Sequence, residues 1–283
     1  MAGKTSNVLQ GIRYVILLFF LIFFLFPVYW MVITAFKTSD KWFTWPPSFI
    51  PWPITLDSFI GAGEVYRTAS LREVVPYLVN SLAVSLITSA LTVALATLTA
   101  YSISRFRTGG MRLLSWILSM RMLPPIAVGV PIYVVFHSLG ILNTWMALVL
   151  VYTVFTSSFG VWVLVSFFND IPRELDEAAY IDGCDPFQAF VRIILPISLP
   201  GIIAIFVISF AFSWGEFLLA LLLTYDKYAQ TLPVFIGRYI TGFQIAWGPI
   251  AASGLVAMLP ATILTFLALR YLISGLTLGA VRG

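Results

Sequence analysis

The chain has 283 residues, of which 60% are hydrophobic, 16% are aromatic and only 10% are charged. Because soluble domains carry about 25% charged residues, this composition excludes a water-soluble core and indicates a protein whose solvent is a lipid bilayer. The single cysteine, Cys184, excludes an intramolecular disulfide framework and a cysteine metal cluster, and the net charge of +4 is a topology signal, since nothing resembles a nucleic-acid-binding patch.

Apolar segments divide the chain. A membrane-spanning helix needs about 20 mostly apolar residues. Six segments meet this criterion, at approximately 12–36, 77–101, 113–136, 145–168, 199–224 and 249–272. The first is too long for the core of a signal peptide and lacks a small-residue cleavage site, which indicates a retained helix. The sequence therefore predicts an all-α membrane protein with one transmembrane domain over residues 1–283.

The loops between these segments carry the orientation signal, because basic residues near the spans determine topology. The short loop 102–112 contains three arginines, whereas the loop 138–143 on the other side contains none. This difference predicts that both termini are cytoplasmic. The outer loop 37–73 holds three tryptophans and four prolines, which fits an aromatic belt at the lipid headgroups or, alternatively, a landing surface for an external partner.

The third segment is the least regular, because Arg121 and the pair Pro124-Pro125 interrupt it. Prolines within spans are tolerated where neighbouring helices or water satisfy the freed backbone groups, so such helices often line a cavity. His137 lies at the outer end of this segment without a nearby cysteine or second histidine. We therefore expect it to snorkel towards the interface and not to bind a metal or take part in catalysis.

A polar island at 169–196 separates the fourth and fifth segments and contains six of the chain's twelve acidic residues. Pro172 and the acidic residues after it suit the first turn of a helix, and Gly183 supplies a left-handed stop. Asp185-Pro186-Phe187-Gln188 then restarts a helix with a capping box, which Pro196 would close. The island is predicted to form two short helices at the membrane surface.

Two functions fit this helix pair equally well from its residues alone. It is either a docking element or an interfacial pair that only closes the bundle. In the docking alternative, Ala178 and Ala179 allow a partner's backbone to approach closely, and Phe187 protrudes as a knob.

The motif of the island resembles that of a known family. Glu177-Ala178-Ala179, followed by Gly183 and later by Ile193 and Leu195-Pro196, resembles the EAA loop of ATP-binding-cassette importer permeases. RMLPP at 121–125, SWGEF at 213–217 and GLTLGAVRG at 275–283 are similar to the carbohydrate-uptake, maltose-type branch. The resemblance covers nearly the whole chain. Gly215 departs from the asparagine of many relatives, so no side-chain contact is expected there.

This resemblance implies a six-helix type I importer permease without catalytic or metal-binding residues. Its partners would be a second, different permease, two ATPase subunits that bind ATP and Mg, an extracytoplasmic solute-binding protein and a small carbohydrate. Its place would be the cytoplasmic membrane of a prokaryote, with several spans. By this match ATPase coupling would belong to Glu177, Ala178, Ala179 and Gly183, and the pattern of the island itself adds Asp185 and Phe187. The tail 273–283 would contact the ATPases through Gly275, Leu276, Thr277 and Arg282, or else be a frayed terminus.

Polar residues within the spans are candidates for the substrate path, because they are costly there and tend to be functional. Glu216 beside Trp214 suggests a sugar platform, although Glu216 is equally well interpreted as a structural acid. Arg121 is its possible partner, or snorkels towards the cytoplasm. Asn80 on the second segment and Tyr133 on the third are further candidates, but such residues more often join helices than bind ligands.

Two other classes of protein compete with the importer permease. An ion-coupled secondary carrier should show charged relays within its spans, and only Arg121 and Glu216 qualify. An intramembrane enzyme needs an activated nucleophile or a metal cluster, and neither is evident. The glycine pair at 109–110 lacks the Gly-Lys-Ser/Thr ending of a phosphate-binding loop. The energy of ATP hydrolysis therefore has to reach this chain from a partner, through the island.

Overall fold

The computed structural model describes residues 2–61 and 71–280, and the side chains of residues 9–61 and 72–269. The described chain is helical, and its only strand-like feature is one antiparallel bridge between Ile240 and Ile245. The chain divides into two compact units, Met1–Val75 with Ile236–Met258, and Pro76–Phe235 with Leu259–Gly283. The sequence suggested one domain over residues 1–283.

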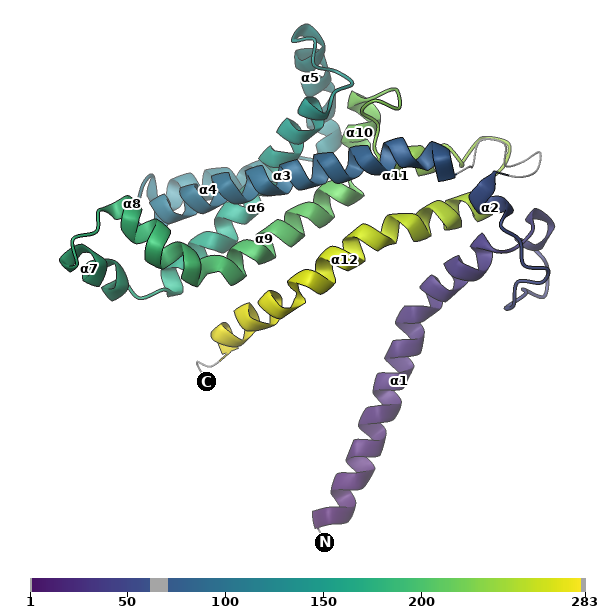
Figure 1. The fold of residues 1–283 in the computed structure, drawn as a ribbon, viewed down its shortest axis with the longest axis horizontal. Coiled ribbons are helices and arrows are strands. Elements are labelled where there is room, and N and C mark those ends of the chain that lie inside the picture. The colour runs from purple at the N-terminus through teal and green to yellow at the C-terminus, as the bar shows by residue number, and fades with distance from the viewer. Residues whose placement is uncertain (1, 62–70, 281–283) are drawn as a thin grey trace. The chain divides into compact units, whose positions relative to one another are not determined.

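Five stretches of helix in the described part of the chain are long and apolar enough to cross a membrane, and one bent pair adds a sixth if it counts as one span. They lie in α1 (Ala2–Ala35), α3 (Leu71–Phe106), α6 (Trp145–Asp170), the continuous run Pro186–Gly215 that contains α9 (Leu195–Gly215), and α12 (Trp247–Ala280) (Figure 1). The prediction of an all-α, multi-span membrane protein is confirmed.

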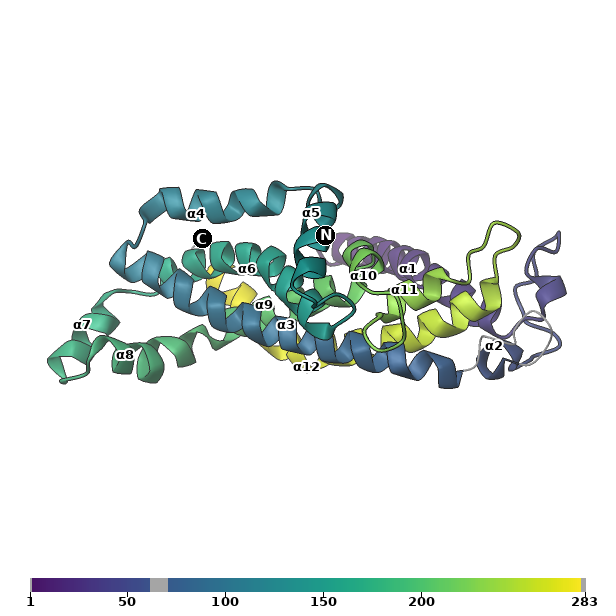
Figure 2. The ribbon, with the colours of Figure 1, turned by 90° about the horizontal axis from the view of Figure 1, so that it is seen from above.

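The third predicted span is not one straight helix. α4 (Gly110–Ser119) and a 3-10 turn, η2 (Met120–Met122), meet α5 (Pro125–Ser138) at an angle of 92°. Leu123 and Pro124 at the bend are extended, with ψ of 122° and 129°. A proline disfavours helical backbone in the residue before it, and Pro124 and Pro125 impose this twice in succession. Figure 2 shows α5 turned away from the direction of α4.

The fifth predicted span is also interrupted. α9 ends at Gly215, and the short helix α10 (Leu218–Leu223) begins after the extended residue Glu216, whose ψ is 128°. The apolar composition of 199–224 gave no sign of this break, because the interruption depends on hydrogen bonds made by Glu216.

The first unit contains α1, η1 (Ser39–Lys41), α2 (Asp57–Ile60) and the start of α12. Only 6% of the apolar window of α1 is buried. Trp30, Trp42, Phe43 and Trp247 line a cavity of about 370 Å³, while Trp45 and Trp52 of the outer loop are exposed. Lys37, just beyond the span, lies with its ammonium 4.4 Å from the centre of the Trp30 ring, and burial lowers the pKa of that amine.

The second unit is built around α6. Its core joins residues of α3, α4, α6 and α9, among them Ala96, Leu114, Leu164 and Ile205. The hydroxyls of Thr92 on α3 and Thr156 on α6 lie 2.6 Å apart. α7 (Glu174–Ile181) and α8 (Pro186–Ala189) lie at one end of α6 and α9, and α10 and α11 (Leu232–Gly237) lie towards the other (Figures 1 and 2). The two ends of this unit hold the two candidate sites.

Candidate functional site

The first site is the polar island. α7 carries acidic residues Glu174, Asp176 and Glu177 in its first turn, where the positive end of the helix dipole favours them. The helix stops at Gly183, whose φ of +86° is readily adopted by glycine, and the Cys184 N–H donates to the carbonyl of Ala179 over 2.9 Å. The predicted first helix and its stop are both found in the structure.

The second helix of the island starts as predicted but does not end as predicted. Asp185 forms a capping box: its carboxylate accepts from the Gln188 N–H over 2.8 Å, and the Gln188 side chain accepts from the Asp185 N–H. Pro196 does not close this helix. α8 continues through a π-helical segment, η3 (Phe190–Ile194), into α9, so one helical run extends over Pro186–Gly215. The wider π segment ends two residues before Pro196, which cannot donate an α-helical hydrogen bond.

The exposed surface of the island differs in one respect from the prediction. Glu177 and Ala178 are exposed, but Ala179 is only 1% exposed and packs inward, because a helix that rests on a core must bury one face. Phe187 is 68% exposed and Ile181 is 86% exposed. We call Glu177, Ala178, Ile181, Gly183 and Phe187 the island surface. It is an apolar and acidic patch on two short helices, of which α8 begins with a capping box.

Asp176 is the residue of the island that sequence reasoning missed. Its carboxylate is buried and lies 2.9 Å from the Nε of Arg105, at the end of α3. Arg105 was counted as a topology-determining loop charge, but it belongs to α3 and is paired. A single arginine at the end of a long apolar helix was the signal in the sequence that could have indicated a buried acidic partner.

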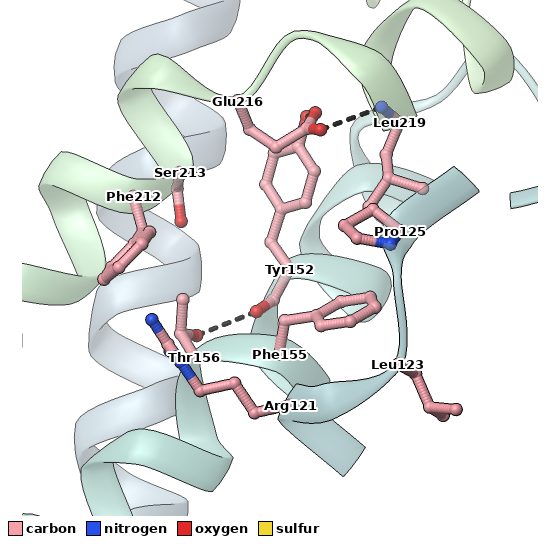
Figure 3. Close-up of a pocket in the computed structure, with 10 residues that line it drawn as sticks. All are labelled: Arg121, Leu123, Pro125, Tyr152, Phe155, Thr156, Phe212, Ser213, Glu216 and Leu219. Carbon is pink, nitrogen blue, oxygen red and sulfur yellow. Dashed lines mark hydrogen bonds between the residues drawn. The ribbon is translucent and has the colours of Figure 1, made fainter. Parts of the chain in front are cut away.

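The second site is a cavity of about 210 Å³ where the two broken helices face α6. Residues of the bend after η2, of α6, and of the junction between α9 and α10 surround it (Figure 3). The lining is rich in aromatic rings and also carries hydroxyls and charges; it consists of Arg121, Leu123, Pro125, Tyr152, Phe155, Thr156, Phe212, Ser213, Glu216 and Leu219. The hydroxyl of Ser213, a residue 4% exposed, has no hydrogen-bond partner among the described residues.

Arg121 is held by aromatic rings. Its guanidinium carbon lies 4.9 Å from the centre of the Phe159 ring and 4.5 Å from that of Phe212. Such contacts stabilise a cation through the negative face of the ring. In the described part of the chain Arg121 forms no ion pair with Glu216, and Figure 3 shows the two charged groups at different ends of the cavity. Of the two alternatives considered for Arg121, the ion pair with Glu216 is not found in this structure.

Glu216 is a structural acid. One oxygen of its carboxylate accepts from the Leu219 N–H over 2.8 Å, and the other accepts from the Ala220 N–H over 3.0 Å and from the Tyr152 hydroxyl over 2.7 Å. The carboxylate thereby caps α10 and fastens it to α6 (Figure 3). This outcome matches the structural alternative for Glu216 and explains why α9 and α10 are separate helices.

Three other candidates lie away from the cavity. Trp214 is 9% exposed and stacks on Phe210, with ring centres 5.4 Å apart, so it does not form a platform with Glu216. Asn80 donates to the carbonyls of Lys227 and Gln230 and accepts from the Trp145 indole, which makes it a link between helices and a loop. Tyr133 is exposed on α5, where it stacks with His137.

The cavity residues Tyr152, Phe155, Thr156 and Phe212 were not singled out in the sequence, and Ser213 appeared only as the first residue of the SWGEF motif. They are common residue types in an apolar helix, and only the two helix breaks bring them together. Among the described residues, no group of three histidine, cysteine or acidic side chains could hold a metal ion. The cavity therefore offers aromatic faces and hydrogen-bonding groups, which suit a polar solute with apolar edges.

The tail extends the last helix further than expected. α12 continues to Ala280, eight residues past the predicted end of the span at 272, so Gly275, Leu276 and Thr277 are helical. Their side chains and the whole of Arg282 lie outside the described residues.

Comparisons with known proteins agree on one family. Residues 92–277 match the model of the family described as "Binding-protein-dependent transport system inner membrane component". The chain is 34% identical to the trehalose transport system permease protein SugB of Mycobacterium tuberculosis, over 92% of this chain and 93% of that protein. It is also 34% identical to the sulfoquinovosyl glycerol transport system permease protein SmoH of Agrobacterium fabrum, over 92% of this chain and 89% of that protein.

A solved structure has the same fold. A chain in the crystal structure of a bacterial ABC transporter involved in the import of the acidic polysaccharide alginate superposes with a TM-score of 0.74. The match covers 95% of this chain and 98% of that chain at 15% sequence identity. At this identity the match supports the fold and not the solute.

Proposed function

Because the chain belongs to the family of binding-protein-dependent transport system inner membrane components, we propose that it is a permease subunit of an ATP-driven sugar importer. The chain conducts the solute and does not hydrolyse ATP. A solute-binding protein delivers a small carbohydrate at the outer face. ATP and Mg are bound by two partner ATPase subunits, and a second, different permease completes the pathway.

The observation that carries this proposal is the island surface. An exposed phenylalanine, an exposed isoleucine and an exposed acidic residue are concentrated on two short helices at one end of the second unit. Short helices of this kind move as units, and an apolar patch rimmed by charge is typical of a protein–protein contact. Glu177, Ala178, Gly183, Asp185 and Phe187 form or shape the contact with an ATPase, and Ala179 supports it from the buried side.

Two further contacts belong to the same assembly. The tail, through Gly275, Leu276, Thr277 and Arg282, touches the ATPases. Transport by a chain shortened after Ser274 that equals transport by the full chain would refute this contact. α1 presents an almost fully exposed apolar surface, which suits lipid and the second permease.

The orientation follows from the same reasoning. The island surface meets an ATPase only where ATP is present, so α7 lies on the cytoplasmic side. If the bent pair α4–α5 counts as one crossing, six crossings put both termini on that side too. Labelling of a terminal tag in sealed inside-out membranes, and not in right-side-out ones, tests this orientation.

The cavity in the second unit is the solute path within this chain. Tyr152, Phe155 and Phe212 offer aromatic faces to the C–H face of a sugar ring. Arg121 and the unpartnered Ser213 hydroxyl offer donors to its hydroxyls. Glu216, Asn80 and Trp214 maintain the structure around this path through their bonds and packing within the protein, and Tyr133 lies outside it on α5.

The experiment that tests the function is affinity purification of tagged chain in mild detergent from its native membrane, followed by mass spectrometry and an ATPase assay. We expect a second multi-span permease and an ATP-binding subunit to co-purify with ATPase activity. Glu177→Arg reverses the charge of the island surface and should remove the ATPase. Asp170→Arg, an exposed acidic residue at the end of α6, is the matched control and should retain it.

A contrary result is equally clear. A chain that purifies alone, and still transports solute into vesicles without ATP, would establish a secondary carrier. Retention of the ATPase by Glu177→Arg at the level of the control would reject the island surface as the docking site.

A further inference from the structure

We propose that Arg105 and Asp176 are positioning residues that transmit the movement of α7 to α3, and through α3 to the cavity. This inference rests on the proposed function, since it assumes that an ATPase moves α7. It adds a defined mechanical link between the island surface and the helix bundle.

The centre of this link is a buried ion pair. The Nε of Arg105 lies 2.9 Å from one Asp176 carboxylate oxygen, and the two side chains are only 6% and 8% exposed. The Tyr101 hydroxyl, one turn earlier on α3, donates to the other oxygen over 3.3 Å. Asp176 is thus the only carboxylate of α7 turned into the protein, while Glu174 and Glu177 face outward.

Arginines reach across the junction in both directions. Arg105 of α3 donates to the carbonyl of Ile171 over 3.1 Å, and Arg173 donates to the carbonyl of Ser104 over 3.0 Å. The Ser104 hydroxyl also donates to the Asn169 side chain over 2.6 Å. The end of α3 is therefore attached to the segment leading into α7 at several points, although about 65 to 75 residues of sequence separate them.

Aromatic packing makes the junction stiff. The Tyr101 ring contacts Phe190 of η3 with ring centres 4.5 Å apart, and Phe168 of α6 with ring centres 5.8 Å apart. Phe168 is completely buried and Phe190 nearly so. A close-packed junction does not deform continuously, so a displacement of α7 is passed to α3 and not absorbed locally.

α3 leads from this junction to the cavity. The Thr92 hydroxyl lies 2.6 Å from that of Thr156, which lines the cavity on α6. Between the junction and Thr92 the helices are tightly packed: a Cβ at Gly160 of α6 would lie 3.0 Å from Ala96 and 3.1 Å from Ile205. Asp176 is thus connected to Thr156 through its contacts with Arg105 and Tyr101, the α3 helix itself and the Thr92–Thr156 hydrogen bond.

The test uses a reporter that needs no knowledge of the solute. Leu123 lines the cavity and is 49% exposed. In a Cys184→Ser background, Leu123→Cys is placed in the purified complex with its ATPases. The rate of its reaction with a charged maleimide is measured without nucleotide and with ATP and vanadate. We expect nucleotide to change this rate by roughly tenfold, as a two-state transition of the bundle would.

Asp176→Ala should keep the ATPase bound and active, while the nucleotide-dependent change in labelling falls to less than about twofold. Asp182→Ala is the matched control, because Asp182 is an exposed carboxylate at the other end of the same helix. Asp176→Asn keeps the shape of the side chain and the contact with Tyr101 but removes the charge, so it should also lose most of the change. Asp176→Glu should restore part of it.

Two outcomes would overturn the positioning role. One is a labelling change in Asp176→Ala equal to that in Asp182→Ala. The other is a parallel loss of assembly, ATPase activity and labelling change in all the Asp176 variants, which would indicate a merely structural residue. Both are distinct from failure of the proposed function, in which Glu177→Arg would keep its ATPase or no ATPase would co-purify at all.

Discussion

The two ends of the second unit hold their charges in opposite ways. At the island end, the carboxylate of Asp176 meets the guanidinium of Arg105 directly, in a buried pair. At the cavity end, Glu216 is satisfied by a tyrosine hydroxyl and two backbone N–H groups, and Arg121 rests between two phenyl rings.

This difference makes the junction of Arg105 with Asp176 rigid, whereas the lining of the cavity can adapt. A buried ion pair fixes one geometry, because each charge would be left buried without a partner if the two side chains separated. At the cavity, Arg121 and Glu216 each have partners of their own and form no ion pair with each other. The space between the two charged groups therefore stays open. The chain thus has a stiff connection where force would enter and an open lining where a solute would pass.

The largest expected effect on stability comes from breaking the ion pair between Arg105 and Asp176. Arg105→Ala leaves Asp176 buried without its cation and should destabilise the folded chain by about 3 kcal/mol, measured as thermal unfolding in detergent. The double variant with Asp176→Ala removes the orphaned charge and should be clearly more stable than Arg105→Ala alone. If the double variant lost stability as the sum of the two single variants, the pair would not be an interacting unit.

A smaller loss is expected at the cavity end. Glu216→Ala removes the cap of α10 and the acceptor of the Tyr152 hydroxyl, at an expected cost of about 2 kcal/mol in the same unfolding assay. Glu216→Gln keeps one acceptor oxygen and should lose less. Equal stability of Glu216→Ala and the wild type would show that the junction between α9 and α10 does not depend on this carboxylate.

The smallest effect concerns the aromatic clamp, by which we mean the Phe159 and Phe212 rings that hold the Arg121 guanidinium. Phe212→Leu keeps an apolar side chain but removes one ring from Arg121, a contact worth about 1 kcal/mol. Stability should change little, whereas the apparent affinity for transported solute should fall by roughly fivefold as Arg121 becomes less well positioned. Phe266→Leu, the same substitution at an exposed ring of α12 that does not line the cavity, is the comparison variant. The same affinity in both variants would argue against the clamp.

Local signals in the sequence predicted the island well, because its structure depends on neighbouring residues. Gly183 supplies a positive φ and Asp185 bonds within its own helix, so both effects are visible in a short stretch of sequence. The length and apolarity of the spans likewise predicted the number of long helices, apart from the bend that Pro124 and Pro125 introduce.

The cavity and the ion pair could not be predicted in this way, because they depend on residues distant in the sequence. Glu216 appeared to lie within a helix until its bond to Tyr152, 64 residues away, was known. Arg105 and Asp176 are 71 positions apart, and no local sequence pattern around either residue identifies the other as its partner. Ala179 was assigned to the wrong face because Ala178 beside it is equally small, and only packing separates them.

The central claim is that the island surface contacts an ATP-binding subunit, and a photo-cross-link tests it most directly. Phe187, which is 68% exposed, would be replaced by a photoreactive phenylalanine analogue in the tagged chain in its native membrane. Illumination should produce one main adduct, between this chain and an ATP-binding subunit, and the adduct should be absent when the analogue replaces Phe212 in the cavity. An adduct with lipid alone, or with no ATP-binding protein, would contradict the account.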